Sequence, residues 1–251
     1  MSTAPSRSRP QRVAVEVGLT LLLVCLARTS LAASYTVASG SMQPSLLIGD
    51  RMLAEPFAYG YSTATLPFGD HLPHGVRIFG RLPARGDIIV FRAPAAPGTS
   101  WVKRVIGVPG DHVRMQAGRL WLNGQRVAWT NGGLVDEELA DGSGATAERF
   151  TEILPGGQPH AILKRDAHNP LDDTPDILVP VGHLFVLGDN RDDSADSRVP
   201  VAAGGVGLLP IWNLQGRVEI VLASRDLAPG ASGPAAWLAS FRPGRFMHVT
   251  R

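Results

Sequence analysis

The chain has 251 residues, of which 44% are hydrophobic and 18% are charged, a composition that excludes both a disordered chain and a multi-span membrane protein. Its 24 basic and 22 acidic residues leave a formal net charge of +2, too balanced to predict a nucleic-acid-binding surface. The 28 glycines and 20 prolines favour short strands joined by many turns, so the sequence predicts a mainly β protein.

The N-terminal part of the chain divides into a basic tail and an apolar run. Three arginines stand in residues 1–12, and residues 13–33 are mostly apolar, with an uncharged centre over 17–27 flanked by Glu16 and Arg28. A bilayer span takes about 20 residues, a length that this run reaches if both charged side chains extend to the interfaces. We predict one transmembrane anchor with the arginine-rich tail in the cytoplasm. The alternative is a secretory signal cleaved at the small residues that end the run.

The first candidate reactive group follows the apolar run directly. Ser41 lies in the stretch Ser39-Gly40-Ser41-Met42-Gln43-Pro44-Ser45. Gly40 has no side chain to obstruct a polypeptide substrate, and Pro44 fixes one backbone angle, so the stretch suits a presented nucleophile. The same residue types are also typical of an ordinary turn. A short buried strand is predicted next, over 46–48.

Further strands are predicted in chain order wherever apolar residues run between turn signals. They cover 51–54, 88–92, 101–111 with a sharp turn at its end, 183–188 and 214–222, with hairpin turns at Ala117-Gly118 and Asn123-Gly124. Residues 130–180, rich in glycine, proline and aspartate, predict an irregular insertion or a small β subdomain. The apolar residues near the C-terminus are expected either to pack on the core or to touch the membrane surface.

A serine nucleophile needs a base, because a free hydroxyl is a weak nucleophile at neutral pH. No histidine stands in a motif that marks it as the partner of Ser41, and the Gly-x-Ser-x-Gly elbow is absent. Lys103 is the stronger candidate, since it is one of two lysines in an arginine-rich chain and stands between Val102 and Val105 on an apolar strand. Burial there would favour the neutral amine. A lysine that points to solvent is the alternative.

The stretch from Asp189 to Arg198 is the third candidate. Its carboxylates suggest calcium, but it lacks the central glycine and final glutamate of a calcium-binding EF-hand loop. A buried polar network is the other interpretation, in which Asp196 pairs with Arg198 and Ser194 offers its hydroxyl to an amine. A solvated turn is the third. The cysteine and histidine pattern predicts no zinc site.

Four blocks of this sequence resemble the bacterial type I signal peptidases in order and approximate spacing. They are Ser39-Gly40-Ser41-Met42-x-Pro44, Arg85-Gly86-Asp87-Ile88-Ile89-Val90-Phe91, Lys103-Arg104-x-x-Gly107-x-Pro109-Gly110-Asp111 and Gly188-Asp189-Asn190-Arg191-x-x-Ser194-x-Asp196-Ser197-Arg198. Ala38 and Asp193 depart from the residues that are frequent there in the family. The resemblance implies a membrane-anchored Ser/Lys dyad endopeptidase that removes N-terminal signal peptides from exported preproteins through an acyl-enzyme.

The resemblance also implies a role for each matching residue. Ser41 would be the nucleophile and Lys103 the base, and the Ser41 amide and the Ser39 hydroxyl would form the oxyanion hole. Ser194 would orient the lysine amine, while Asp196 and Arg198 would hold the loop that carries Ser194. The pockets for small substrate residues at positions −1 and −3 would be bordered by Val37, Met42 and Val102. No cofactor, no metal and no nucleic acid is implied. The partners are exported preproteins and the lipid bilayer, and the chain is expected to be a monomer.

The resemblance and the anchor together predict an organisation and a location. The expected parts are a cytoplasmic basic tail over 1–12, a transmembrane anchor over 13–33, a catalytic antiparallel β core from 34–104 and 181–225, an inserted β subdomain over 105–180 and a C-terminal segment over 226–251. The core would lie on the periplasmic side of the bacterial inner membrane. Two alternatives stay open: a relative dedicated to one substrate, of the conjugal-transfer type, and a catalytically silent membrane-tethered β module that binds peptides.

Overall fold

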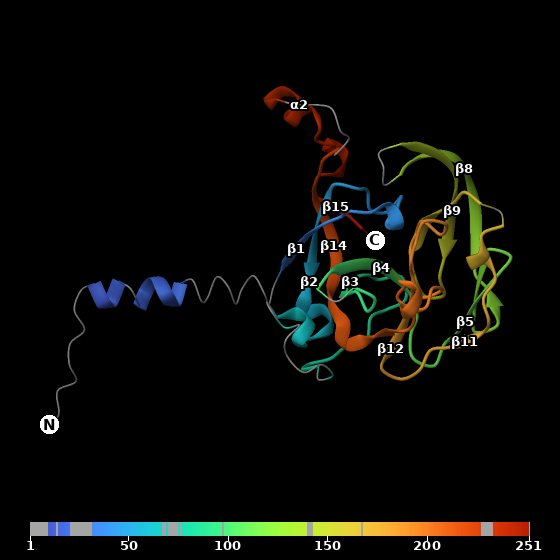
Figure 1. The fold of residues 1–251 in the computed structure, drawn as a ribbon, viewed down its shortest axis with the longest axis horizontal. Helices are drawn as coiled ribbons and strands as arrows, with labels where there is room; N and C mark the ends of the chain where they lie inside the picture. Colours follow the sequence, from blue (N-terminus) through green and yellow to red (C-terminus); the bar gives the residue numbers. More distant parts are fainter. Residues whose placement is uncertain are drawn as a thin grey trace.

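The computed structural model describes residues 10–13, 15–20, 32–66, 69, 75, 77–96, 98–139, 143–166, 168–226 and 233–250. The strands in this part of the chain form three antiparallel sheets (Figure 1), so the prediction of a mainly β, antiparallel fold is confirmed. The tail over 1–9 and most of the predicted anchor, at 14 and 21–31, lie outside the described residues. Among the described helices, none has both the length and the apolar character to cross a membrane.

The largest sheet carries the segments that match the sequence blocks. Its strand order is β1-β2-β14-β3-β4-β12-β13, with β15 paired to β14. The strands are β1 (Ala33–Thr36), β2 (Asp50–Glu55), β3 (Ile88–Arg92), β4 (Ser100–Gly107), β12 (His183–Leu187), β13 (Leu209–Pro210), β14 (Leu214–Ser224) and β15 (His248–Val249). These bounds confirm the strands predicted over 51–54, 88–92, 183–188 and 214–222.

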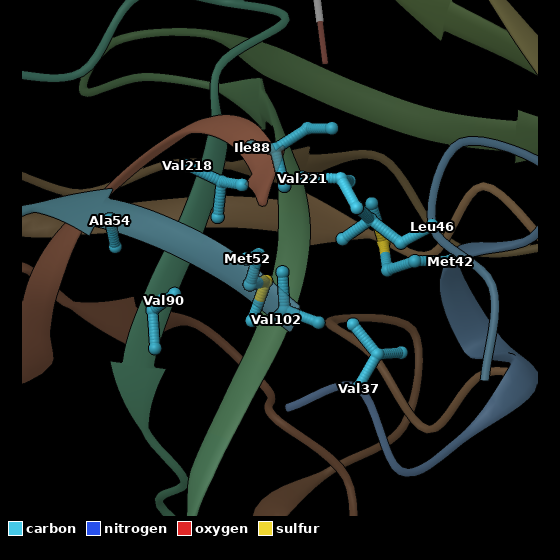
Figure 2. Close-up of a cluster of buried hydrophobic side chains, with 10 residues drawn as sticks. All are labelled: Val37, Met42, Leu46, Met52, Ala54, Ile88, Val90, Val102, Val218 and Val221. Atoms are coloured by element: carbon cyan, nitrogen blue, oxygen red, sulfur yellow. The ribbon is translucent and has the colours of Figure 1, made fainter. Parts of the chain in front are cut away.

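The continuous apolar run in β3 reflects burial on both faces of the sheet. Ile88 and Val90 belong to one buried cluster, whereas Ile89 and Phe91 belong to another on the opposite face. Successive side chains of a strand point to opposite faces, so a strand covered on both sides needs apolar residues at every position. The first cluster, drawn in Figure 2, also contains Val37 and other residues that lie beneath the loop joining β1 to β2.

Two smaller sheets lie between β4 and β12 in the sequence and to one side of the main sheet in Figure 1. One has the order β11-β5-β6-β7, with β5 (His112–Gln116), β6 (Arg119–Leu122), β7 (Gln125–Arg126) and β11 (Ile177–Leu178). The other, called the inserted sheet below, has the order β10-β9-β8, with β8 (Ala128–Glu138), β9 (Gly144–Ile153) and β10 (Pro159–Lys164). Both predicted hairpin turns are confirmed, since Ala117, Gly118, Asn123 and Gly124 all have positive φ.

The structure corrects two local predictions. Residues 46–48 form no strand; they lie in a turn, and β2 begins only at Asp50. Leu46 is nevertheless fully buried, which explains the apolar pattern. Of the two alternatives predicted for residues 130–180, the irregular insertion is wrong and the small β subdomain is what the structure shows, because the inserted sheet occupies much of this segment. A bulge between Asn131 and Leu134 interrupts the alternation of β8, and this interruption hides the strand in the sequence.

Short helices complete the described structure. They are η1 (Gly40–Met42), η2 (Pro56–Tyr59), η3 (Thr63–Thr65), η5 (Pro170–Asp172), η6 (Val201–Ala203), η7 (Ile211–Asn213), α2 (Pro234–Ala239) and η8 (Pro243–Arg245). Near the C-terminus, Trp237, Leu238 and Phe246 are exposed rather than packed in the core. The Arg245 guanidinium of η8 instead pairs with the fully buried carboxylate of Asp50 at the start of β2.

Candidate active site

Ser41 lies in η1, a single helical turn on the loop between β1 and β2. The turn is held from below by apolar side chains, because Met42 and Leu46 are both fully buried in the cluster shown in Figure 2. Ser41 itself is 7% exposed, and a backbone bond from Gln43 N–H to the Gly40 carbonyl closes the turn. This local anchoring gives the Ser41 hydroxyl a fixed position.

The Lys103 side chain extends from β4 of the main sheet to Ser41. Its Nζ lies 2.7 Å from the Ser41 Oγ and 3.1 Å from the Val102 carbonyl oxygen. The side chain is buried, with 4% of the residue exposed. Burial lowers the pKa of Lys103 to about 8, although the carboxylates of Asp196 and Asp189 partly oppose this change. A substantial neutral fraction of the amine therefore exists near neutral pH.

Ser39 lies on the exposed side of the same turn. Its Oγ is 3.4 Å from the Ser41 Oγ, so the two hydroxyls face the same space. Val37 is buried just before them and Val102 lies on β4 beside Lys103. The structure therefore brings together the predicted residues of β4 and of the loop between β1 and β2 that contains η1.

The loop after β12 closes the rear of this site. Gly188 lies so near the turn that a Cβ there would stand 2.5 Å from the Ser41 carbonyl oxygen and 2.3 Å from the Ser194 Oγ. The glycine is thus required by close packing. Ser194 is buried, but its hydroxyl makes no hydrogen bond with the Lys103 amine among the described residues, in contrast to the role that the resemblance implies.

Asp196 and Arg198 form a buried ion pair in this loop. The guanidinium donates to both carboxylate oxygens at 2.9 Å, and the Gly188 N–H donates to the same carboxylate at 3.0 Å. Burial by itself would raise the pKa of Asp196, but the Arg198 charge and the hydrogen bonds that the carboxylate accepts together outweigh it and hold that pKa below its usual range. The pair stays ionised and fixes the backbone next to Ser194.

A second buried ion pair was not predicted from the sequence. Arg104 follows Lys103 on β4 and therefore points to the opposite face, where its guanidinium donates to both carboxylate oxygens of Asp189 at 2.7 and 2.6 Å. It also donates to the Ser45 hydroxyl at 3.1 Å, just beyond η1. Two features of the sequence indicate this pair. Side chains along β4 alternate between the two faces of the sheet, and a second positive charge, Arg104, follows Lys103 directly.

An elongated cavity of about 480 Å³ opens in front of Ser41 and Lys103. Its lining includes the apolar and aromatic residues Tyr35, Val37, Met52, Trp101 and Val102. Aromatic and aliphatic side chains dominate these walls, so the cavity suits small apolar groups and an extended polypeptide. Tyr35 and Trp101 were not singled out by the sequence analysis.

Met42 takes a different place from the other predicted pocket residues. Its side chain is fully buried in the cluster of Figure 2 and is not among the residues that line the cavity, whereas Val37 and Val102 are. The described residues contain no group of three or more metal-ligating side chains.

A serine hydroxyl 2.7 Å from a buried amine, beside an apolar cavity on an antiparallel β scaffold, is an arrangement that suits a serine peptidase. The family comparison then makes the assignment specific, because the profile of the family described as signal peptidase, peptidase S26, matches residues 11–223. The chain belongs to this family of hydrolases, whose members remove signal peptides from exported preproteins.

Several relatives share most of their length with this chain. Signal peptidase I from Rickettsia bellii is 34% identical over 218 residues, which cover 83% of this chain and 72% of the relative. Signal peptidase I from Pseudomonas aeruginosa is 35% identical over 214 residues, covering 81% and 69%. A crystal structure of a signal peptidase I from Enterococcus faecalis is 24% identical, covers 55% of this chain and 97% of that chain, and has a TM-score of 0.32.

Proposed function

We propose that the chain cleaves signal peptides with a dyad of Ser41 and Lys103. The supporting observation is the 2.7 Å distance between the Lys103 Nζ and the Ser41 Oγ in a buried setting that lowers the lysine pKa to about 8. A neutral amine at this distance can accept the hydroxyl proton, which an arginine cannot do.

The proposed reaction has two stages. The Ser41 Oγ attacks the scissile carbonyl carbon while its proton passes to the Lys103 amine, and the ammonium then gives that proton to the departing amine of the mature protein. An acyl-enzyme on Ser41 remains. The neutral lysine next removes a proton from water as the water oxygen attacks the ester carbon. The bond to the Ser41 Oγ then breaks, the ammonium returns its proton to that oxygen, and the signal peptide leaves with a carboxylic acid end that ionises in solution.

The oxyanion is proposed to bind at the Ser41 N–H and the Ser39 hydroxyl. The 3.4 Å between the two serine oxygens places the Ser39 Oγ next to the reacting centre. Loss of one such donor commonly costs about 10²–10³ in kcat. Ser194, buried behind Gly188, is proposed as a second partner of the amine as its proton moves, with the Asp196–Arg198 pair holding the loop in place.

The cavity supports a preference for small residues at positions −1 and −3. An extended substrate would lie between the backbones near Val37 and Val102, because both residues line the cavity beside Ser41. Met42 would act indirectly, since its buried side chain belongs to the same apolar cluster as Val37. No cofactor is required by this reaction.

The proposal includes the anchor and the predicted organisation of the chain. Residues 13–33 would hold a monomeric enzyme in the bacterial inner membrane, with 1–12 in the cytoplasm and the catalytic core of 34–104 and 181–225 on the periplasmic side. The two sheets within 105–180 would form the inserted subdomain. A relative dedicated to one substrate is the alternative, and a panel of different preproteins distinguishes it from a general enzyme.

The decisive experiment is cleavage of a preprotein with an Ala-x-Ala site by the detergent-solubilised chain. Ser41→Ala and Lys103→Met are each expected to abolish cleavage while far-ultraviolet circular dichroism shows that they fold. Arg126→Met, which removes a positive charge from the exposed strand β7, is the matched control and should cleave normally. Full activity of Lys103→Met would show that the lysine is not the base.

A further inference from the structure

The inserted sheet contacts the loop behind the active site with one charged side chain from each of its three strands. Glu137 of β8 accepts from the Asn190 amide at 2.5 Å, and Glu152 of β9 accepts from the Arg191 guanidinium at 2.6 and 3.2 Å. Lys164 of β10 donates to Asp192 at 3.0 Å. Three consecutive residues of the loop are thus held by three neighbouring strands.

Backbone bonds extend this contact. The Leu163 N–H of β10 donates to the Asp189 carbonyl, and the Arg191 N–H donates back to the Leu163 carbonyl, both at 2.9 Å. Asn190, which lies between these two loop residues, is completely buried. One parallel β-bridge, between Leu163 and Asn190, therefore joins the loop to the edge of the inserted sheet.

Asn190 connects this sheet to the nucleophile turn. Its backbone N–H donates to the Ser41 carbonyl at 3.1 Å, and its side-chain Nδ2 donates to the Gly40 carbonyl at 3.3 Å. The Gly40 carbonyl and the Ser41 N–H belong to one planar peptide group, so a bond that orients the carbonyl also sets the direction of the N–H. That N–H is the backbone donor of the proposed oxyanion hole.

Glu137 determines how the Asn190 amide is oriented. An ionised carboxylate only accepts hydrogen bonds, so the Asn190 nitrogen must face it, and the second amide hydrogen is then directed at the Gly40 carbonyl. Glu137 is 1% exposed, and besides the Asn190 amide it has a charged neighbour, because the Arg165 Nε lies 3.3 Å from the Glu137 Oε2. A buried carboxylate that loses its partners destabilises a fold, so Glu137 depends on both Arg165 and Asn190.

The backbone of β8 explains how Glu137 arrives at this position. The register of β8 against β9 shifts between Asn131 and Leu134, and Gly133 within the bulge has a φ of 89°. A bulge bends its strand and increases its twist. The ribbon of β8 is curved in Figure 1, and the hydrogen bonds of Asn190 to Glu137 and to the Gly40 carbonyl bring Glu137 close to η1.

We propose that Glu137 is a positioning residue for the reaction, acting through Asn190 to orient the Gly40–Ser41 peptide group for oxyanion binding. The inserted sheet is then part of the catalytic machinery rather than an accessory domain. This inference rests on the proposed function of Ser41, and its test separates the two.

The test measures the single-turnover cleavage rate and the substrate Kd of the full detergent-solubilised chain with a signal-peptide-bearing substrate. Glu137→Leu and Asn190→Leu are each expected to slow the chemical step about ten- to a hundredfold, less than the full loss of an oxyanion donor, with little change in Kd. Glu137→Gln keeps an acceptor for Asn190 and should recover most of the rate. A purely structural role would not produce this recovery.

Phe150→Leu is the matched control, because it perturbs the packing of β9 against Trp129 without touching the loop. If this control slows cleavage as much as Glu137→Leu at equal loss of thermal stability, the positioning role is wrong. Should Glu137→Leu fail to fold, Gly133→Ala strains the bulge instead and is expected to slow the same step. If the folded Glu137 variants cleave at the normal rate while Ser41→Ala is inactive, the positioning role is wrong and the proposed function stands. Cleavage by Ser41→Ala would instead contradict the proposed function itself.

Discussion

Lys103→Met is expected to change the pH dependence of stability by an amount that the structure sets. Burial lowers the lysine pKa from 10.5 to about 8, and at about 1.4 kcal/mol for each pKa unit the difference is worth about 3 kcal/mol. Below pH 8 the amine is charged in both the folded and the unfolded chain, so the folded protein bears the whole cost of burying the charge. Between about pH 8 and 10.5 the unfolded chain binds more protons, and the stability of the native protein rises with pH.

The assay is urea unfolding of the native chain and Lys103→Met at several pH values from 7 to 11. From pH 8 to 10.5, the free energy of unfolding of the native chain is expected to rise by about 3 kcal/mol relative to that of Lys103→Met. The hydrogen bonds lost in the variant add a difference that does not depend on pH. Ser41→Ala keeps the lysine and should follow the native curve. A difference that does not vary with pH would refute the argument that this amine is buried with a lowered pKa.

Three further predictions follow from the same contacts. Gly188→Ala places a methyl group 2.5 Å from the Ser41 carbonyl oxygen, and overpacking of this kind costs about 1–3 kcal/mol. We therefore expect cleavage to slow at least tenfold in a chain that still folds, and an unchanged kcat would contradict this. Arg245→Ala leaves the buried Asp50 carboxylate unpaired and should lower the free energy of unfolding by about 3 kcal/mol in urea titrations, with partial recovery when Asp50→Asn is added. Burial by itself would raise the pKa of Glu152, but the adjacent Arg191 guanidinium outweighs it and holds that pKa at about 2. The Glu152 carboxylate therefore stabilises the fold above pH 4.5, and this contribution is lost as the pH falls toward 2. Glu152→Gln should flatten the acid-unfolding curve followed by circular dichroism in this range.

Local sequence signals predicted the parts of the fold that depend on neighbouring residues. Asn123-Gly124 predicted a hairpin turn because both residues tolerate the positive φ that the structure shows. The unbroken apolar run of β3 predicted a strand, and Ser41 with its glycine neighbour was identified as a candidate nucleophile. Short-range backbone preferences and side-chain periodicity are sufficient for such features.

The inserted sheet was harder to predict, because its strands depend on pairing between distant segments. The bulge in β8 breaks the alternation from which a strand is recognised, and many side chains of β9 face solvent. Likewise, 46–48 looked like a strand because Leu46 is buried, although a turn buries it equally well. Apolar pattern alone reports burial and does not identify the backbone conformation that achieves it.

The sequence alone determined that Ser41 and Lys103 are the candidate reactive groups, because each stands in a local setting that suits its chemistry. Only the tertiary structure decided that their atoms lie 2.7 Å apart, since 62 positions separate them in the chain. Glu137 is the clearest contrast: it stands in a run of acidic residues typical of an exposed surface, yet it is buried against Asn190. Burial of that kind depends on how three sheets pack together, and no local pattern encodes it.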